Sequence, residues 1–235
     1  MQNFAFDRRS FVAGARAIAP LAAPAVPFGF VLGVAIAESG IDRFAAGASS
    51  ALIFAGASQL AAVELLAEQA SAAVVLVAIS FINARHLMYS AAIRPRFVTF
   101  PRWFRIVGPY VLLDQSFAMA LDQPDEMGDR ARMWHFLGSG AFLWAMWISV
   151  TTLGIVFGDV INPDWQLSFA GPILFGGLMV LSISDRAGVV AAAVGAVVSI
   201  VASGLPQGSG VLVAIVCGVA AGSITASSKT DKVAA

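Results

Sequence analysis

The chain has 235 residues, of which 59% are hydrophobic and 12% are charged, and its 14 basic and 14 acidic side chains cancel. Charged residues are about half as frequent as in soluble proteins, too few to cover a globular domain of this length. A soluble fold and a nucleic-acid-binding surface are thereby excluded, and we expect an integral membrane protein.

Eight apolar segments follow one another, separated by clusters of charge, proline and glycine. A helix needs about 20 apolar residues to span a bilayer, and the segments lack the alternation of a membrane β-barrel. We expect an all-α, polytopic fold with seven to eight hydrophobic segments, some discontinuous or re-entrant, in a single transmembrane domain over residues 1–235. The segments are residues 11–37, 44–67, 71–93, 106–122, 134–158, 168–184, 187–204 and 209–227.

The first segment is preceded by Arg8 and Arg9, a pair typical of twin-arginine export signals. Such a signal precedes a soluble passenger, whereas here apolar sequence continues to residue 224. The interpretation we favour is that Arg8, Arg9 and Arg16 hold the N-terminus in the cytoplasm.

The same segment contains Pro27, Phe28 and Gly29. Proline inside a helix removes a backbone donor and clashes with the preceding turn, and transporters use broken helices to present backbone groups to substrates. Pro27, Phe28 and Gly29 are therefore candidate substrate-binding residues. The alternative is a simple kink, with Gly29 and Gly33 forming a close helix contact.

The second segment contains Gly56, Ser58 and Gln59, followed by Glu64. Gly56 permits unwinding, and Ser58 and Gln59 supply a hydroxyl and an amide at one level. Gln59 and Glu64 are costly to expose to lipid, so we predict that both face the protein interior. The alternative to a substrate site is hydrogen bonding between helices.

The third segment carries Asn83, Arg85 and His86 after a long apolar stretch. An arginine at membrane depth costs on the order of 2.5–3.5 kcal/mol. Asn83 and His86 are three residues apart and share a helix face, which favours a polar stripe. Alternatively, Arg85 lies near the membrane interface and extends to the headgroups.

The fourth segment places Asp114 and Gln115 between apolar residues. A carboxylate there must pair, reach water or take up a proton. Pairing with Arg85, binding a substrate ammonium and carrying a coupling proton all remain open for Asp114.

Two topologies are compatible with the charge distribution. Eight spans that start in the cytoplasm would place four arginines outside, against the positive-inside rule. Six spans, with segments 44–67 and 106–122 not crossing, would place all four inside. These residues are Arg94, Arg96, Arg102 and Arg105.

Metal and nucleotide chemistry have little basis in the sequence. Cys217 is the single cysteine, and His86 and His135 are the only histidines, so neither a cysteine-based zinc site nor a histidine-rich centre is expected. There is also no phosphate-binding loop sequence. We expect no cofactor.

The motifs together resemble one known family. Pro27-Phe28-Gly29, Ala55-Gly56-Ala57-Ser58-Gln59, Asn83-Ala84-Arg85-His86 and Asp114-Gln115-Ser116-Phe117 are similar, in order and spacing, to those of the AzlC family. The resemblance covers roughly residues 10–225. It implies a bacterial inner-membrane permease, the large subunit of a branched-chain amino acid exporter, with a small AzlD-type membrane partner. Family members commonly have a second acid where this chain has Gln115, which leaves Asp114 and Glu64 as candidates for proton coupling.

A binding hypothesis follows for a small hydrophobic amino acid. Amides at the helix breaks, or Arg85, would bind the substrate carboxylate. Asp114 or Gln59 would accept the ammonium. The aromatic side chains of Phe28, Phe54 and Phe117 would line the apolar part of the pocket.

Two other functions compete with transport. One is a rhomboid-like intramembrane serine protease, in which Ser58 would be the nucleophile and His86 its base. The other is a membrane scaffold or assembly subunit whose intramembrane polar residues are structural contacts. We do not expect an enzyme.

Glycine pairs and a short echo bear on assembly. Gly154 with Gly158, and Gly218 with Gly222, could support a homo-oligomer or packing within one chain. Residues 27–32 faintly resemble residues 172–177, as inverted repeats would, although chance also explains the similarity.

Overall fold

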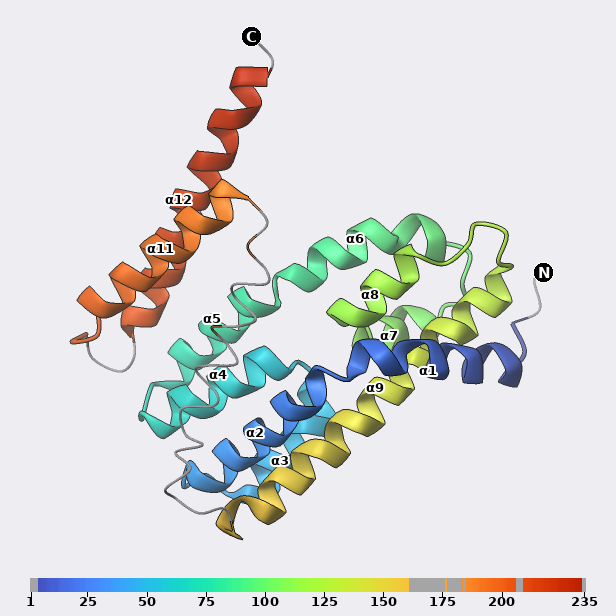
Figure 1. Ribbon diagram of the computed structural model, residues 1–235, viewed down its shortest axis with the longest axis horizontal. Coiled ribbons are helices and arrows are strands. Elements are labelled where there is room, and N and C mark those ends of the chain that lie inside the picture. The colour runs from blue at the N-terminus through green and yellow to red at the C-terminus, as the bar shows by residue number, and fades with distance from the viewer. Residues whose placement is uncertain (1–3, 161–175, 177–182, 184, 206–208, 234–235) are drawn as a thin grey trace.

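The computed structural model describes residues 4–160, 176, 183, 185–205 and 209–233. Within these residues it is helical and contains no strand, which confirms the all-α membrane fold. The apolar segment expected at 168–184 and the echo at 172–177 lie outside the described residues, residues 176 and 183 excepted. The helices are α1 (Arg8–Ala22), α2 (Ala25–Glu38), α3 (Arg43–Ile53), α4 (Gly56–Ala67), α5 (Ala72–Asn83), α6 (Arg85–Phe97), α7 (Phe104–Tyr110), α8 (Asp114–Leu121), α9 (Asp129–Phe157), η1 (Gly158–Val160), α11 (Arg186–Val201) and α12 (Ser209–Val233) (Figure 1).

Three helices of the described chain are long and apolar enough to cross a membrane. They are Ala72–Phe97, which joins α5 and α6, Asp129–Phe157 and Ser209–Ala226. The pair α1 and α2 becomes a fourth candidate if it is counted as one span, although its halves are bent by 72°. Several predicted segments are therefore broken, as expected for a discontinuous fold.

The first break differs from the one predicted. The chain turns at Ala23–Pro24, between α1 and α2, and Pro24 is the N-terminal cap of α2. Pro27 instead lies in the first turn of α2, where its missing N–H would lack a helical partner in any case. The expectation that Pro27 itself breaks a helix is therefore wrong.

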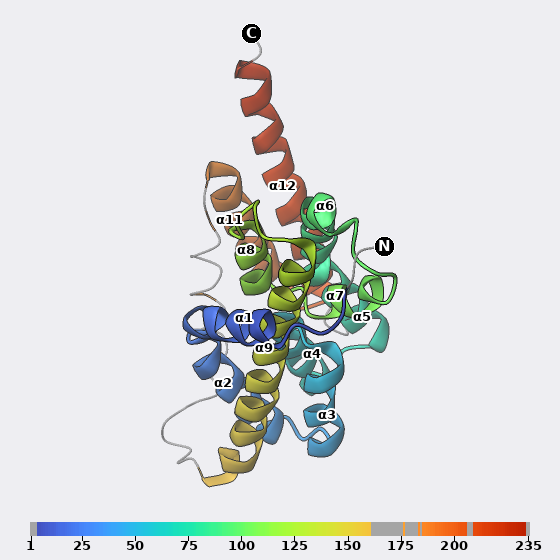
Figure 2. The same ribbon diagram turned by 90° about the vertical axis from the view of Figure 1, so that its right-hand side faces the viewer.

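The long helix α9 holds both halves of the bent pair (Figure 2). A methyl group on Gly14 would collide with the carbonyl oxygen of His135, and one on Gly138 with that of Phe11. The same reciprocal fit joins α2 to the far part of α9. There, Gly33 lies against the backbone of Thr151, and Gly154 against that of Phe30. Helix α9 is thus in close glycine contact with α1 at one place and with α2 at another. Because each contact sets the direction of its own helix, the first segment bends between α1 and α2.

The second predicted segment divides between α3 and α4. Phe54 ends α3 in the left-handed region, with φ 36° and ψ 50°, and α4 begins at Gly56. A side chain on Gly56 would collide with the rings of Trp147 and Phe28. Glycine therefore lets the backbone at the α3–α4 break approach α9 closely. This break is at the position that the sequence indicated.

The remaining helices form two further groups. Helices α7 and α8 replace the single predicted segment 106–122, with a break at residues 111–113. Helices α11 and α12 pack as a hairpin, and α12 reaches α5 through Val211, Leu212 and Ile215. Gly218 and Gly222 contact α11, and Gly154 and Gly158 contact α2. These four glycines therefore make packing contacts within one chain.

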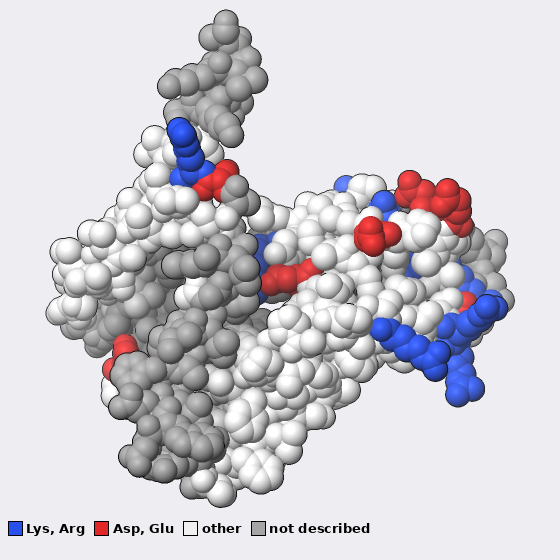
Figure 3. Space-filling view, in the orientation of Figure 1, with Lys and Arg blue, Asp and Glu red and all other residues white. Residues whose placement is uncertain are grey.

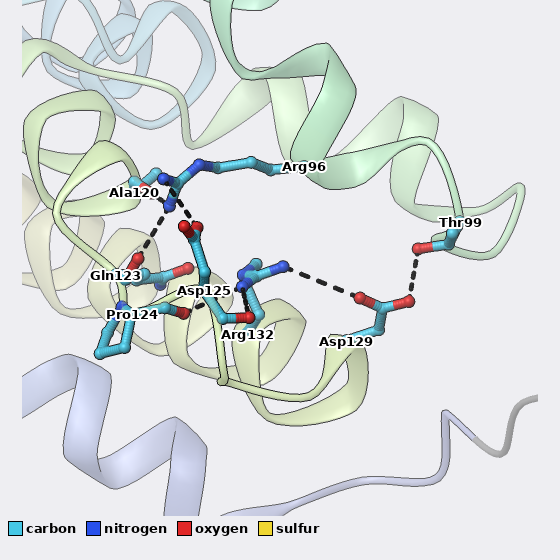
Figure 4. A network of polar contacts seen from close by, with 8 residues as sticks. All are labelled: Arg96, Thr99, Ala120, Gln123, Pro124, Asp125, Asp129 and Arg132. Carbon is cyan, nitrogen blue, oxygen red and sulfur yellow. Dashed lines mark hydrogen bonds and ion pairs between the residues drawn. The ribbon is translucent and has the colours of Figure 1, made fainter.

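Charged atoms gather at one end of the face shown in Figure 3, over the N-terminal part of α1 and the α8–α9 loop. Arg96 and Arg132 both bind the α8–α9 loop, as Figure 4 shows. Arg96 donates to the carbonyl oxygens of Ala120 and Gln123, at 3.3 and 2.8 Å, and pairs with Asp125 at 3.2 Å. The loop between α8 and α9 is thus held by guanidinium groups bound to backbone.

Candidate functional site

The polar triplet of the third segment lies where α5 meets α6. Ala84 closes α5 and opens α6, and the bonds around it span three residues, from Ala84 N–H to Phe81 and from Leu87 N–H to Ala84. The regular bonding of an otherwise continuous helix is therefore interrupted at Asn83 and Arg85. A local break in a spanning helix is where backbone and side-chain groups become available for function.

Asn83 connects this junction to the break between α3 and α4. Its amide nitrogen donates to the Ser58 hydroxyl at 3.1 Å, and the Ser58 hydroxyl donates to the Ala55 carbonyl at 2.9 Å. The Asn83 carbonyl oxygen of the backbone lies 3.1 Å from Nδ1 of His86. The side-chain oxygen of Asn83 is buried without a hydrogen-bond partner, so it could accept a bond from a ligand at no loss of an existing contact.

Arg85 and Asp114 form an ion pair across α6 and α8. Nη1 of Arg85 lies 2.8 Å from Oδ2 of Asp114, and the side chains are 33% and 48% exposed. Asp114 is also the first residue of α8, where the helix dipole favours a carboxylate. Of the three alternatives for Asp114, pairing with Arg85 is the one that the structure shows. Because the pair is partly exposed, a ligand could reach both charges.

Aromatic rings surround this ion pair. Tyr89 stacks on Phe117 with ring centroids 4.3 Å apart, and His86 meets the edge of Tyr89 at 5.9 Å. Stacked and edge-to-face rings of this kind stabilise a fixed geometry. The rings restrict α6 relative to α8 and hold Arg85 opposite Asp114.

A cavity of about 200 Å³ lies at the α3–α4 break. Its lining residues are Ile53, Phe54, Ala55, Asn83, His86, Pro109, Tyr110 and Leu112. Helix α4 begins there at Gly56 without a side-chain cap, so the amides of its first turn have no helical partner. The amide of Asn83 and the imidazole of His86 therefore border a mainly apolar space, and the start of α4 follows directly on its wall residue Ala55.

Tyr110 was not among the residues predicted from the sequence. Its hydroxyl donates to the carbonyl of Ala51 in α3, and Nε1 of Trp144 donates to the Tyr110 hydroxyl at 2.8 Å. A tyrosine in an otherwise apolar stretch was a signal of the same kind as Asn83, since its hydroxyl also needs a partner in a membrane. It ties α7 and α9 to the open end of α3 beside the cavity.

Gln59 is placed differently from the other candidates. It is 1% exposed, and its amide nitrogen donates to the hydroxyls of Ser49 and Ser50, at 2.8 and 2.7 Å. Its carbonyl oxygen accepts from Trp147 at 3.4 Å. Both the amide nitrogen and the carbonyl oxygen of the Gln59 side chain are thus hydrogen-bonded to other side chains of the protein.

Of the predicted polar site residues, Asn83 and His86 line the cavity, whereas the others, Arg85 and Asp114 included, do not. Phe28 and Gly29 pack against Trp147 in the core, and Gln115 is half-buried on α8. Glu64 is exposed on the surface of the chain, which contradicts the prediction that it faces the interior. It follows Gln59 by five residues, and the helix rotates it by about 140° to another face.

Ser58 and His86 do not form a nucleophile–base pair among the described contacts. The Ser58 hydroxyl bonds to Ala55 and Asn83, whereas the His86 ring nitrogen approaches the backbone of Asn83. Geometry first, then pKa, decides such a pair, and this arrangement offers no support for a serine protease.

Comparison with known proteins identifies the fold family. A model of the family described as "AzlC protein" matches residues 20–161, more than half of the chain. The chain belongs to the AzlC family. The matched region contains every candidate site residue discussed above, and the family supports a membrane transport-related role.

Two relatives are membrane proteins. The chain is 24% identical over 225 residues to inner membrane protein YgaZ of Escherichia coli, covering 92% of this chain and 89% of YgaZ. It is 29% identical over 146 residues to an uncharacterized membrane protein of Archaeoglobus fulgidus, covering 62% of this chain and 61% of that protein. No solved structure matches the chain.

Proposed function

We propose that this AzlC-family chain is a secondary transporter that exports branched-chain or other small hydrophobic amino acids across the bacterial inner membrane. The observation that carries the proposal is the partly exposed Arg85–Asp114 pair, whose arginine is the sequence neighbour of His86 on the wall of the cavity. A zwitterionic amino acid has one positive and one negative group, and this pair offers one partner for each.

In the proposed bound state the substrate replaces the internal ion pair. The substrate carboxylate binds Arg85, whose planar guanidinium can form two parallel hydrogen bonds. The ammonium binds Asp114. Because each charge exchanges one partner for another, binding leaves neither charge uncompensated in a region of low polarity.

The cavity suits the apolar side chain of such a substrate. Phe54, Leu112 and the ring of Tyr110 contribute apolar surface. Its volume of about 200 Å³ is below the roughly 300–1,000 Å³ of sites for drug-sized ligands. A cavity of this size suits a smaller group, such as the side chain of an amino acid. Of the three phenylalanines expected to line the pocket, Phe54 lies on the cavity. Phe28 belongs to the core around Trp147, and Phe117 stacks on Tyr89.

Energy coupling and the partner are further parts of the proposal. When the substrate leaves, Asp114 either re-forms its pair with Arg85 or takes up a proton, and only the second course would couple export to the proton gradient. Glu64 is a weaker candidate because it is exposed on the chain surface. We also propose a small AzlD-type membrane subunit as a partner, on the ground of the family alone. The exposed apolar side chains of α5 and α12 suit contact with lipid as well as with such a subunit.

The test is efflux of labelled leucine or valine from cells that express the chain with and without a small AzlD-type subunit. Arg85→Gln and Asp114→Asn should each reduce efflux roughly 10- to 100-fold, because each removes a charged hydrogen bond to the substrate. Arg102→Gln is the matched control, since Arg102 is an exposed arginine that neither lines the cavity nor pairs with a described carboxylate. Efflux that is unchanged in both site variants at equal expression would rule out this site.

The same purified variants separate transport from a scaffold role. Leucine should raise the unfolding temperature of the unaltered chain, because a ligand that binds only the folded state stabilises it. It should not do so for Arg85→Gln. No stabilisation by any aliphatic amino acid, with or without the partner, would favour the scaffold.

A further inference from the structure

A second cavity opens between α6 and α7, and it adjoins the candidate substrate cavity at the shared wall residues Pro109 and Leu112. Its volume is about 390 Å³, and apolar side chains, including Phe97, Val98 and Phe104, make up most of its wall. Arg94 from α6 and Arg105 from α7 also line it. Two guanidinium groups from different helices therefore border one apolar space.

Neither arginine is neutralised within the described chain. Their neighbour Arg96 pairs with Asp125, and Arg132 pairs with Asp129. Arg94 and Arg105 are exposed and have no ion pair with a described carboxylate. A pair of like charges at the rim of one cavity is unfavourable unless an anion lies between them.

The surroundings are those of a membrane interface. Trp103 is partly exposed one residue before α7, and tryptophan is enriched where the bilayer meets water. Val98, which lines the cavity, and Ile106, the residue after Arg105 on α7, are exposed apolar side chains on the chain surface. A molecule that fills the cavity would therefore have one anionic end at the arginines and an apolar remainder along these side chains.

We propose that the α6–α7 cavity binds the headgroup of an anionic phospholipid. The phosphate lies between Arg94 and Arg105, where guanidinium groups form charge-assisted hydrogen bonds to phosphate oxygens. The hydroxyl of Ser90, which also lines the cavity, is a further donor. An acyl chain lies along Val98 and the aromatic wall. Basic pockets between membrane helices bind anionic headgroups in this way.

The position of the site gives the lipid a structural effect. Helix α6 carries Arg85 at its start and Arg94 near its end, and α7 ends at Tyr110 beside the substrate cavity. The lipid would join the two helices at the end opposite the Arg85–Asp114 pair. It should therefore stabilise the folded chain through Arg94 and Arg105, neither of which lines the substrate cavity.

The experiment compares the full chain in micelles supplemented with phosphatidylglycerol or phosphatidylcholine. Bound lipid is counted by native mass spectrometry, and the unfolding temperature is measured in parallel. Phosphatidylglycerol should bind and stabilise, and phosphatidylcholine should not. Arg94→Gln and Arg105→Gln should each weaken phosphatidylglycerol binding about fivefold, and the double variant roughly 25-fold. Arg102→Gln, the matched control on the same connection, should bind as the unaltered chain does.

Each remaining outcome counts against the site. Full phosphatidylglycerol binding in the double variant would overturn it, as would an equal loss in Arg102→Gln. Stabilisation by inorganic phosphate alone, at the same concentration, would mean that the cavity binds free phosphate rather than a lipid. Should the double variant not fold, the two single variants and Val98→Glu, which puts a carboxylate at the cavity mouth, provide the same test.

Discussion

Two arginine clusters of the molecule use the same chemistry for different ends. At the α8–α9 loop, the side chain of Arg132 is 9% exposed and donates to the backbone carbonyls of Pro124 and Asp125, at 3.0 and 3.2 Å. At the α5–α6 junction, Arg85 is 33% exposed and bonds to a side chain, Asp114. A backbone carbonyl is fixed in place by the fold, whereas a carboxylate side chain can release one cation and bind another. The first arrangement holds a loop, and the second can accept a ligand.

The largest effect should come from Arg132→Gln. Glutamine cannot reach the loop carbonyls and Asp129 together, and it leaves the part-buried bonds to the carbonyls of Pro124 and Asp125 without their donor. We expect the free energy of unfolding to fall by roughly 3 kcal/mol, as measured by equilibrium unfolding in mixed micelles. Efflux per folded molecule should stay near the unaltered level. A loss of stability below about 1 kcal/mol would mean that this cluster does not hold the loop.

Arg85→Gln should show the opposite pattern. An ion pair that is partly exposed contributes about 0–1 kcal/mol to stability, so the unfolding free energy should change little. Efflux should fall roughly 10- to 100-fold. The comparison with Arg132→Gln is the control, because both variants remove one guanidinium. If Arg85→Gln destabilised the chain as much as Arg132→Gln does, the Arg85–Asp114 pair would be structural and the proposed exchange of partners would be untenable.

The sequence was sufficient to predict the fold class, because apolar segments that lack charge can be recognised from neighbouring residues alone. It identified the break at Gly56 and the need of Asp114 for a partner on the same ground. It did not distinguish Pro24 from Pro27 as the site of the first bend. That choice depends on where Gly14 and Gly33 meet α9, more than a hundred residues away along the chain.

The partners of Gln59 were beyond the sequence for a related reason. Helical spacing relates residues within one helix, but Ser49 and Ser50 lie across a break, and Trp147 lies on α9. Helical periodicity cannot be extended across a residue such as Phe54, whose left-handed backbone angles end α3. An amide that looked like a ligand-binding group is therefore an internal contact in this structure.

Gln59→Leu tests that distinction and should have an intermediate effect. The leucine would leave the hydroxyls of Ser49 and Ser50 and the indole of Trp147 without their present partner. We expect a loss of roughly 1–3 kcal/mol in unfolding free energy, with efflux per folded molecule largely retained. Gln115→Leu, on a half-buried side chain of α8, is the control for loss of an amide. A specific loss of efflux in Gln59→Leu without a loss of stability would return Gln59 to the substrate site.

The smallest effect concerns a carboxylate bonded to a helix end and lying outside the membrane segments. Asp7 caps α1, and its carboxylate accepts from the Ser10 backbone N–H at 3.2 Å and from the Ser10 hydroxyl at 2.9 Å. These bonds lower the pKa of Asp7 from its ordinary value of 3.8. A lowered pKa in the folded state means that the contribution to stability is complete above that ordinary value. It is lost as the pH falls below 3.8 through the folded pKa.

Unfolding temperatures measured between neutral and acidic pH should therefore fall slightly less in Asp7→Asn than in the unaltered chain. Identical pH profiles for the two chains would show that Asp7, unlike Arg132, does not stabilise the backbone it contacts.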